Sequence, residues 1–153
     1  MQRSTTLNVL VVDDSPTDLE LAGIYLSKAW PFNSPMAIDT ALDGLEALEK
    51  MRAKQFCLIL LDWCLPKGGN GHVLLEIRRL GVFIPVVVLS GLGRDELPDY
   101  LEAKGAAYLN KMDLNASTLH CAIAEALRFN SAHSAHYQLP SLIPASTAFR
   151  ASL

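Results

Sequence analysis

Five polar residues in this sequence could together manage a phosphate group and a divalent cation. They are Asp13, Asp14, Asp62, Ser90 and Lys111. Crowded carboxylates repel one another, and a hard cation such as Mg²⁺, bound through oxygen ligands, relieves that repulsion. A lysine ammonium opposite the cation would neutralise a phosphoryl group, and the serine hydroxyl could donate to one of its oxygens. The residue types therefore indicate phosphoryl chemistry, provided that the fold brings them together.

The elements that must position these side chains are short apolar runs alternating with helical patterns. Strands are predicted over 9–12, 56–61 and 86–89, with weaker candidates at 36–39 and 107–110. Helical spacing predicts helices over 19–29, 45–51, 73–80, 97–103 and 119–127. Continuous apolar runs suit parallel strands that are buried on both faces. Five strands and five helices in alternation predict an α/β fold with an open parallel sheet and helices on both faces.

In open parallel sheets, functional residues lie beyond the carboxyl ends of the strands. Asp13 and Asp14 directly follow the first run, and Asp62 follows the run 56–61. Polar residues also occur at strand ends simply because these ends approach solvent. That explanation accounts for one or two of them, but not for two adjacent acids with a third after another strand.

The composition excludes several other classes. The chain has 153 residues, 50% of them hydrophobic and 19% charged, which fits one folded domain. A net charge of −3 gives no basic field for binding nucleic acid. The apolar runs are too short to cross a membrane, and no signal peptide is recognised. Three cysteines are too few for a disulfide scaffold, so a soluble cytoplasmic chain is expected.

The last segment differs in composition from the rest of the chain. Residues 130–153 carry one charged side chain, Arg150, but several apolar ones. The apolar residues are Tyr137, Leu139, Leu142, Ile143 and Phe149. We therefore predict a domain over 7–129 and a C-terminal extension over 130–153, which either packs on its own domain or forms a dimerisation arm.

Five short segments carry a resemblance to a known family. They are 11–15 (VVDDS), 60–66 (LLDWCLP), 69–71 (GNG), 85–91 (PVVVLSG) and 105–111 (GAAYLNK). In order and spacing these segments resemble the CheY-like receiver domain of response regulators in two-component signalling, in its single-domain form. The resemblance implies a flavodoxin-like doubly wound sheet with strand order 2-1-3-4-5 and five helices.

The resemblance also implies a role for each site residue. Asp62 would be the phosphoacceptor, and Ser90 and Lys111 would bind the transferred phosphoryl group. The ligands of Mg²⁺ would be Asp13, acting mainly through water, Asp14, Asp62 and the backbone carbonyl of Cys64. Ser90 and Tyr108 would form the switch that reports phosphorylation. A simple packing role for Tyr108 competes with this interpretation.

The sequence departs from the family pattern at Met112, where the family usually has proline after the lysine. We therefore expect a trans bond between residues 111 and 112 and an altered loop before the last helix. In the family, the residues two positions after the phosphoacceptor and two positions after the serine tune the access of water to the phosphoryl group. The resemblance places Cys64 and Leu92 there. Neither side chain orients water as an acid or amide would, which predicts slow self-dephosphorylation.

Three further residues have expectations of their own. Trp63, which directly follows Asp62, is expected to be partly exposed near the surface on which a kinase docks. Cys57 and Cys121 lie on apolar patterns and are expected to pack in the core.

The resemblance implies a signalling protein rather than an enzyme. Its partners would be a sensor histidine kinase or a phosphotransfer protein, and a downstream protein target, because no DNA-binding domain follows the receiver pattern. The extension resembles that of single-domain receivers paired with bacterial phytochromes, which suggests a phytochrome kinase and a homodimer.

Two alternatives remain open at this point. A phosphorylation-independent adaptor is one, but such proteins typically lack one of the site residues. A haloacid-dehalogenase-like phosphohydrolase is the other. It needs an acid two residues after its nucleophile, whereas Ser15 follows Asp13 and Cys64 follows Asp62 at that spacing.

Overall fold

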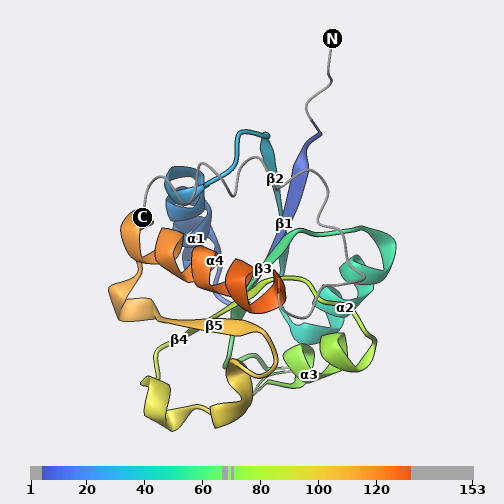
Figure 1. Ribbon diagram of the computed structural model, residues 1–153, viewed down its shortest axis with the longest axis vertical. Coiled ribbons are helices and arrows are strands. Elements are labelled where there is room, and N and C mark those ends of the chain that lie inside the picture. Colours follow the sequence, from blue (N-terminus) through green and yellow to red (C-terminus); the bar gives the residue numbers. More distant parts are fainter. Residues whose placement is uncertain (1–4, 67–68, 70, 132–153) are drawn as a thin grey trace.

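The computed structural model describes residues 5–66, 69 and 71–131, which form one parallel sheet with helices on both faces (Figure 1). The strands are β1 Leu7–Val12, β2 Met36–Ala41, β3 Leu58–Asp62, β4 Val86–Ser90 and β5 Ala106–Asn110. All strand pairs are parallel, and the order is β2-β1-β3-β4-β5. The five predicted strands and the flavodoxin-like order are therefore confirmed.

The helices that flank the sheet are α1 Pro16–Ala29, α2 Gly44–Ala53, α3 His72–Arg79 and α4 Ala116–Ser131. Helix α1 begins after Ser15, whose hydroxyl accepts a hydrogen bond from the amide of Asp18, and Pro16 is its first residue. Helices α1 and α4 lie together on one face of the sheet, and α2 and α3 on the other (Figure 1). None of the described helices combines the length and apolar character needed to span a bilayer.

Side chains alternate between two apolar clusters because successive residues of a strand point to opposite faces. Val9 and Val11 of β1 pack in the cluster that holds Leu26 of α1. Leu10 and Val12 pack in the cluster that holds helices α2 and α3. Burial on both faces explains why the strands appear in the sequence as unbroken apolar runs.

The predicted helix over 97–103 does not form, and this expectation was wrong. Two short 3₁₀ turns, Arg94–Glu96 and Asp99–Leu101, occupy the connection between β4 and β5, so the described residues form four α-helices rather than five. Pro98 lacks an amide hydrogen and forces Leu97 into extended backbone, with φ −103° and ψ 157°. Leu97 and Leu101 are nevertheless buried and cover one side of the sheet.

Trp63 is buried, at 4% exposure, which corrects the expectation that it would be accessible to a kinase. Its ring lies beneath Gly71, the residue that precedes α3. Gly71 has φ 86°, and a Cβ atom there would collide with the Trp63 ring and the Tyr100 hydroxyl. Only glycine adopts this backbone conformation readily and leaves room for the ring.

Of the two cysteines expected in the core, only one lies there. Cys57 is buried, and burial raises its pKa to about 12. Cys121 is exposed, because it occupies a position of α4 that faces away from the sheet. Its expected packing role is therefore wrong.

Candidate functional site

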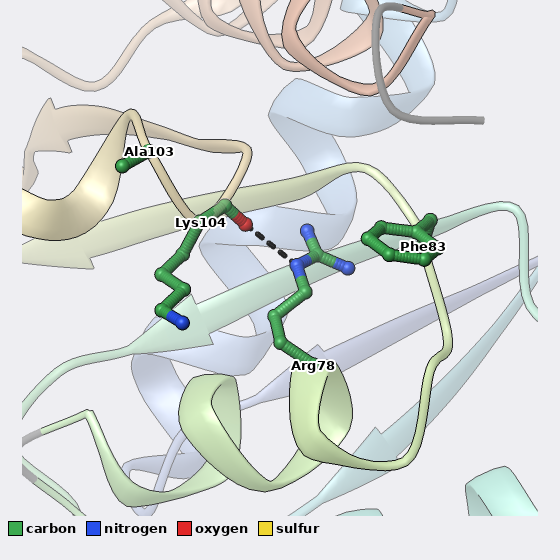
Figure 2. Close-up of a pocket in the computed structure, with 4 residues that line it drawn as sticks. All are labelled: Arg78, Phe83, Ala103 and Lys104. Atoms are coloured by element: carbon green, nitrogen blue, oxygen red, sulfur yellow. Dashed lines mark hydrogen bonds between the residues drawn. The ribbon is translucent and has the colours of Figure 1, made fainter.

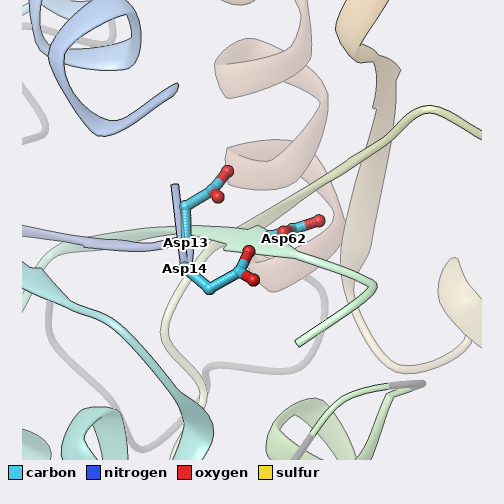
Figure 3. Close-up of side chains that lie close together, drawn as sticks. All are labelled: Asp13, Asp14 and Asp62. Carbon is cyan, nitrogen blue, oxygen red and sulfur yellow. The ribbon is translucent and has the colours of Figure 1, made fainter. Parts of the chain in front are cut away.

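Three carboxylates meet at the carboxyl edge of the sheet. Asp13 and Asp14 follow β1, and Asp62 is the last residue of β3, its parallel neighbour. One oxygen from each side chain lies within 4.8 Å of the others. Figure 3 shows the three side chains grouped at this edge. Asp13 and Asp62 are buried, whereas Asp14 is exposed to solvent. The predicted convergence of these three acids, hereafter the acidic edge, is therefore present in the fold.

Lys111, which follows β5, reaches across this edge to the carboxylates. Its Nζ atom lies 2.8 Å from Oδ2 of Asp13 and 3.4 Å from Oδ2 of Asp62. A third carboxylate, that of Asp18 in the first turn of α1, lies 3.0 Å from the same nitrogen. Asp18 was not among the site residues predicted from the sequence. Nothing in local spacing connects it to a residue 93 positions away.

The pKa shifts of Asp62 and Lys111 follow from burial and from neighbouring charges. Burial, followed by the charge of Asp13, raises the pKa of Asp62 from 3.8 to about 6, although Lys111 opposes this shift. Burial disfavours the charged form of Lys111, but its contacts with Asp13, Asp18 and Asp62 together raise its pKa above the ordinary value. The ammonium is therefore permanently charged, while the carboxylates remain in excess over it.

The donor set suits a hard cation. All three side chains offer oxygen ligands. Asp13 and Asp62 are buried, and the single ammonium of Lys111 does not balance their two negative charges. Ions such as Mg²⁺ and Ca²⁺ prefer such ligands. The backbone amide of Cys64 donates to Oδ1 of Asp62 at 3.2 Å, which fixes the orientation of that carboxylate. The acidic group is thus able to hold a metal ion.

Ser90 lies on the strand next to Asp62. It ends β4, and the preceding residue, Leu89, is the register partner of Asp62. The Ser90 side chain is fully buried, and its hydroxyl accepts a hydrogen bond of 3.0 Å from the amide of Leu92. A hydroxyl that accepts one bond can still donate its own proton. The predicted position of Ser90 beside the acidic edge agrees with the register.

Tyr108 is half-buried in β5, and its ring packs against the cluster on the α2 and α3 side. Its hydroxyl donates to the backbone carbonyl of Leu92 at 2.6 Å. Nδ2 of Asn110 donates to the same carbonyl at 3.4 Å. The two residues predicted as the switch, Ser90 and Tyr108, are therefore joined through the two backbone groups of Leu92.

The bond between Lys111 and Met112 is trans, as expected, since the described residues contain no cis peptide bond. The loop after β5 forms a 3₁₀ turn, Lys111–Asp113, which Asn110 caps by accepting the Met112 amide at 2.9 Å. Asn110 was not predicted as a site residue. An asparagine immediately before the lysine and a non-proline residue after it could have indicated this cap.

The two predicted tuning positions flank the acidic edge. Cys64 and Leu92 are both exposed, Leu92 at 37%. Neither side chain carries a group that would hold a water molecule against Asp62 as an acid or amide does.

A cavity of about 380 Å³ lies at the opposite end of the sheet, near the amino ends of β4 and β5 (Figure 2). Arg78, Phe83, Ala103 and Lys104 line it. The Arg78 guanidinium is already engaged with backbone carbonyls, among them that of Lys104 at 2.6 Å. Arg78 therefore links the backbone of the segments that precede β4 and β5.

A parallel sheet in the order 2-1-3-4-5 with helices on both faces defines the flavodoxin-like class of folds, which includes CheY. Comparison with known proteins is more specific. Residues 9–124 match the model of the response regulator receiver domain. The chain belongs to this family.

Relatives in the family include much longer proteins. The chain is 31% identical over 121 residues to the autoinducer 2 sensor kinase/phosphatase LuxQ of Vibrio parahaemolyticus, which covers 78% of this chain and 14% of that protein. It is 30% identical to the transcriptional regulatory protein ZraR of Klebsiella oxytoca, covering 79% and 26% of the two chains. The chain therefore spans only a small part of these relatives.

Solved structures show the same architecture. The signal receiver domain of a putative Luxo repressor protein from Vibrio parahaemolyticus has a TM-score of 0.70 and 25% identity, covering 88% of this chain and all of that one. The chemotaxis protein CheY4 of Vibrio cholerae has a TM-score of 0.63 and 28% identity, covering 75% and 93%.

Proposed function

We propose that this chain is a phosphorylatable response regulator whose phosphoacceptor is Asp62. The observation that supports this most directly is the position of Asp62, buried at the end of β3. Its carboxylate shares the edge with Asp13 and Asp14, and Lys111 Nζ lies 3.4 Å away. Phosphoryl transfer needs positioning and neutralisation of charge more than covalent assistance from the protein.

In the proposed reaction, an oxygen of Asp62 attacks the phosphorus of a phosphohistidine on a sensor histidine kinase or a phosphotransfer protein. A new P–O bond forms as the P–N bond breaks, and the histidine nitrogen leaves with the electron pair. The ammonium of Lys111 and the hydroxyl of Ser90 hold the phosphoryl oxygens after transfer.

Mg²⁺ is the cation we assign to the acidic edge. Asp13, Asp14 and Asp62, with the backbone carbonyl of Cys64, would hold it, and water would complete its coordination. The ion supplies charge neutralisation for the phosphoryl oxygens. The carboxylate geometry supports this assignment, because oxygen-only ligands in excess negative charge favour a hard cation.

Phosphorylation is read out, in this proposal, through Ser90 and Tyr108. In this proposal the Ser90 side chain rotates towards a phosphoryl oxygen and gives up the bond that it accepts from the Leu92 amide. The Leu92 carbonyl is the acceptor of the Tyr108 hydroxyl. A change at the phosphoryl group would thus reach a half-buried aromatic ring beside the connection between β4 and β5. A downstream protein would recognise the altered surface.

We place this exchange in the cytoplasm, because free cysteines are typical of its reducing environment and the three cysteines of the chain form no disulfide.

We also propose a homodimer formed by the extension 130–153, of which only residues 130 and 131 lie within the described part of the chain. Light scattering on the full chain and on a variant that ends at residue 131 tests this arm. An unchanged solution mass would remove the arm from the proposal.

Intact-mass spectrometry with a small phosphodonor and Mg²⁺ tests the central assignment. The native chain is expected to gain one phosphoryl group, and Asp62→Asn is expected to gain none. Asp95→Asn, which removes an exposed carboxylate elsewhere, is the matched control and should label as the native chain does. Labelling that persists in Asp62→Asn would overturn the assignment.

A further inference from the structure

The first turn of α1 and Lys111 form a closed ring of hydrogen bonds. Oδ1 of Asp13 accepts from the Ser15 amide at 3.0 Å, and Oγ of Ser15 accepts from the Asp18 amide at 3.3 Å. The Lys111 ammonium closes the ring, donating to Oδ2 of Asp18 at 3.0 Å and to Oδ2 of Asp13 at 2.8 Å. The ring connects the ends of β1 and β5 with the start of α1.

Asp18 differs from the other two carboxylates that contact the ammonium. Asp13 and Asp62 belong to the group that can share a cation, whereas Asp18 does not. The Asp18 side chain is 40% exposed, compared with 4% for Asp13 and 5% for Asp62. When a cation takes up the charge of Asp13 and Asp62, Asp18 is the remaining carboxylate in contact with Lys111 among the described residues.

From this arrangement we infer that Asp18 is a positioning residue, which shares the Lys111 ammonium with Asp13 in the unphosphorylated protein and must release it when a phosphoryl group arrives. The inference rests on the proposed function and adds a control element that the three metal-binding candidates and Ser90 do not supply. Asp18 therefore sets how strongly the Lys111 ammonium is held by carboxylates before transfer and by the phosphoryl group afterwards.

The two stages of the reaction respond to Asp18 in opposite directions. Before transfer, Asp18 shares the ammonium with Asp13 and Asp62, so that the charge of Lys111 is divided among three carboxylates, and it adds a negative charge of its own. Both effects favour the binding of Mg²⁺. After transfer, the same charge repels the phosphoryl oxygens and competes with them for Lys111. Asp18 thus assists binding of the metal and opposes the phosphorylated state.

The test measures these two stages separately on Asp18→Asn, which removes the charge with little change in shape. Mg²⁺ affinity is measured without phosphodonor, from the shifts of backbone amides in a magnesium titration by NMR. Its dissociation constant is expected to rise roughly threefold to tenfold, because one charge near the ion is lost. The fraction phosphorylated by a small phosphodonor at saturating Mg²⁺ is expected to exceed that of the native chain.

Two control variants separate positioning from a general change of charge or structure. Glu20→Gln removes an exposed carboxylate from the same helix, two residues further along, and should leave both measurements unchanged. Asp18→Glu keeps the charge within reach of Lys111 and should restore the native Mg²⁺ affinity. An amide spectrum of the native type shows that each variant is folded.

The opposite movement of the two measurements is the signature of this role. If Asp18→Asn loses both Mg²⁺ affinity and phosphorylation, Asp18 only supports the structure. If both measurements on Asp18→Asn equal those on Glu20→Gln, Asp18 has no role. Either result overturns the inference. If the native chain itself takes up no phosphoryl group, the proposed function fails instead. That outcome is read from the native chain alone, so the two failures are distinguishable.

Discussion

The hydroxyl of Tyr108 and the backbone of Leu92 are joined by a hydrogen bond of 2.6 Å, and Leu92 is in turn joined to Ser90 through its amide. This chain of contacts connects the acidic edge with the surface of β5. Leu92 lies between the end of β4 and the 3₁₀ turn Arg94–Glu96, outside the regular hydrogen bonding of both elements.

Tyr108→Phe is expected to loosen residues 91–93 without unfolding the protein. The lost bond is partly exposed, so the free energy of unfolding should fall by about 1 kcal/mol or less. Hydrogen exchange at 91–93 should accelerate, while labelling of Asp62 is retained. Tyr25→Phe on α1 is the control, and equal exchange at 91–93 in both variants would contradict a link through Leu92.

Cys64 and Leu92 are the positions at which we expect the lifetime of the phosphoryl group to be set. Cys64→Asn or Leu92→Gln introduces an amide that can hold water near the phosphorylated Asp62, and the phosphorylated state should decay several-fold faster. The decay is followed by intact mass after removal of the phosphodonor. Leu80→Gln, an exposed leucine after α3, should leave the lifetime unchanged. If neither Cys64→Asn nor Leu92→Gln shortens the lifetime of the phosphorylated state, the expectation of slow self-dephosphorylation is wrong.

Asp62→Asn is expected to stabilise the metal-free protein near neutral pH. Burial and Asp13 raise the pKa of Asp62 to about 6, so the folded state retains a proton that the unfolded chain loses near pH 4. Stability that is present below pH 4 is therefore lost as the pH rises through about 6. The gain in unfolding free energy from the substitution should reach about 1–3 kcal/mol at pH 7 and vanish near pH 4.

Urea unfolding in the presence of a chelator measures this pH dependence. Asp95→Asn supplies the comparison, since it removes a charge from an exposed position. A gain that is independent of pH, or that is greatest in acid, would show that the Asp62 carboxylate is not destabilised by its surroundings. Added Mg²⁺ should narrow the gap, because the ion binds the native carboxylates better than the amide variant.

Arg78 is the side chain whose replacement should cost the most stability among the charged residues discussed. Its guanidinium donates to the carbonyls of Val82, Ile84 and Lys104 at 2.8, 2.8 and 2.6 Å, and to that of Gly105 at 3.4 Å. Burial lowers its pKa to about 10, so it remains charged at neutral pH. Lysine lacks the planar fork, and Arg78→Lys should lower the unfolding free energy by about 2–4 kcal/mol.

Arg79→Lys provides the matched control for this change. Arg79 is exposed and pairs with Glu76 one turn earlier on α3, so its replacement should leave the unfolding free energy nearly unchanged. Chemical denaturation of both variants gives the comparison. Similar losses for the two arginines would show that the backbone carbonyls find other partners.

The acidic edge could be predicted because the signal is local: each acid follows an unbroken apolar run, and parallel strands bring their ends together. The connection between β4 and β5 was predicted as a helix from the spacing of Leu97 and Leu101. Pro98 keeps Leu97 extended, and the segment forms two 3₁₀ turns instead. The contact of Asp18 with Lys111 depends on the angle of α1 against β5. Tertiary packing sets that angle, and no sequence period reports it.

The amino end of β5 is held from two sides. The Gly105 carbonyl accepts from the buried amide of Asn130 on α4 at 2.9 Å, and Arg78 on the other face of the sheet donates to the carbonyls of Lys104 and Gly105. These bonds anchor the amino end of β5, whereas Tyr108 lies further along the strand. We therefore expect a rearrangement between β4 and β5 to move the carboxyl end of β5, with Tyr108, more than its anchored amino end.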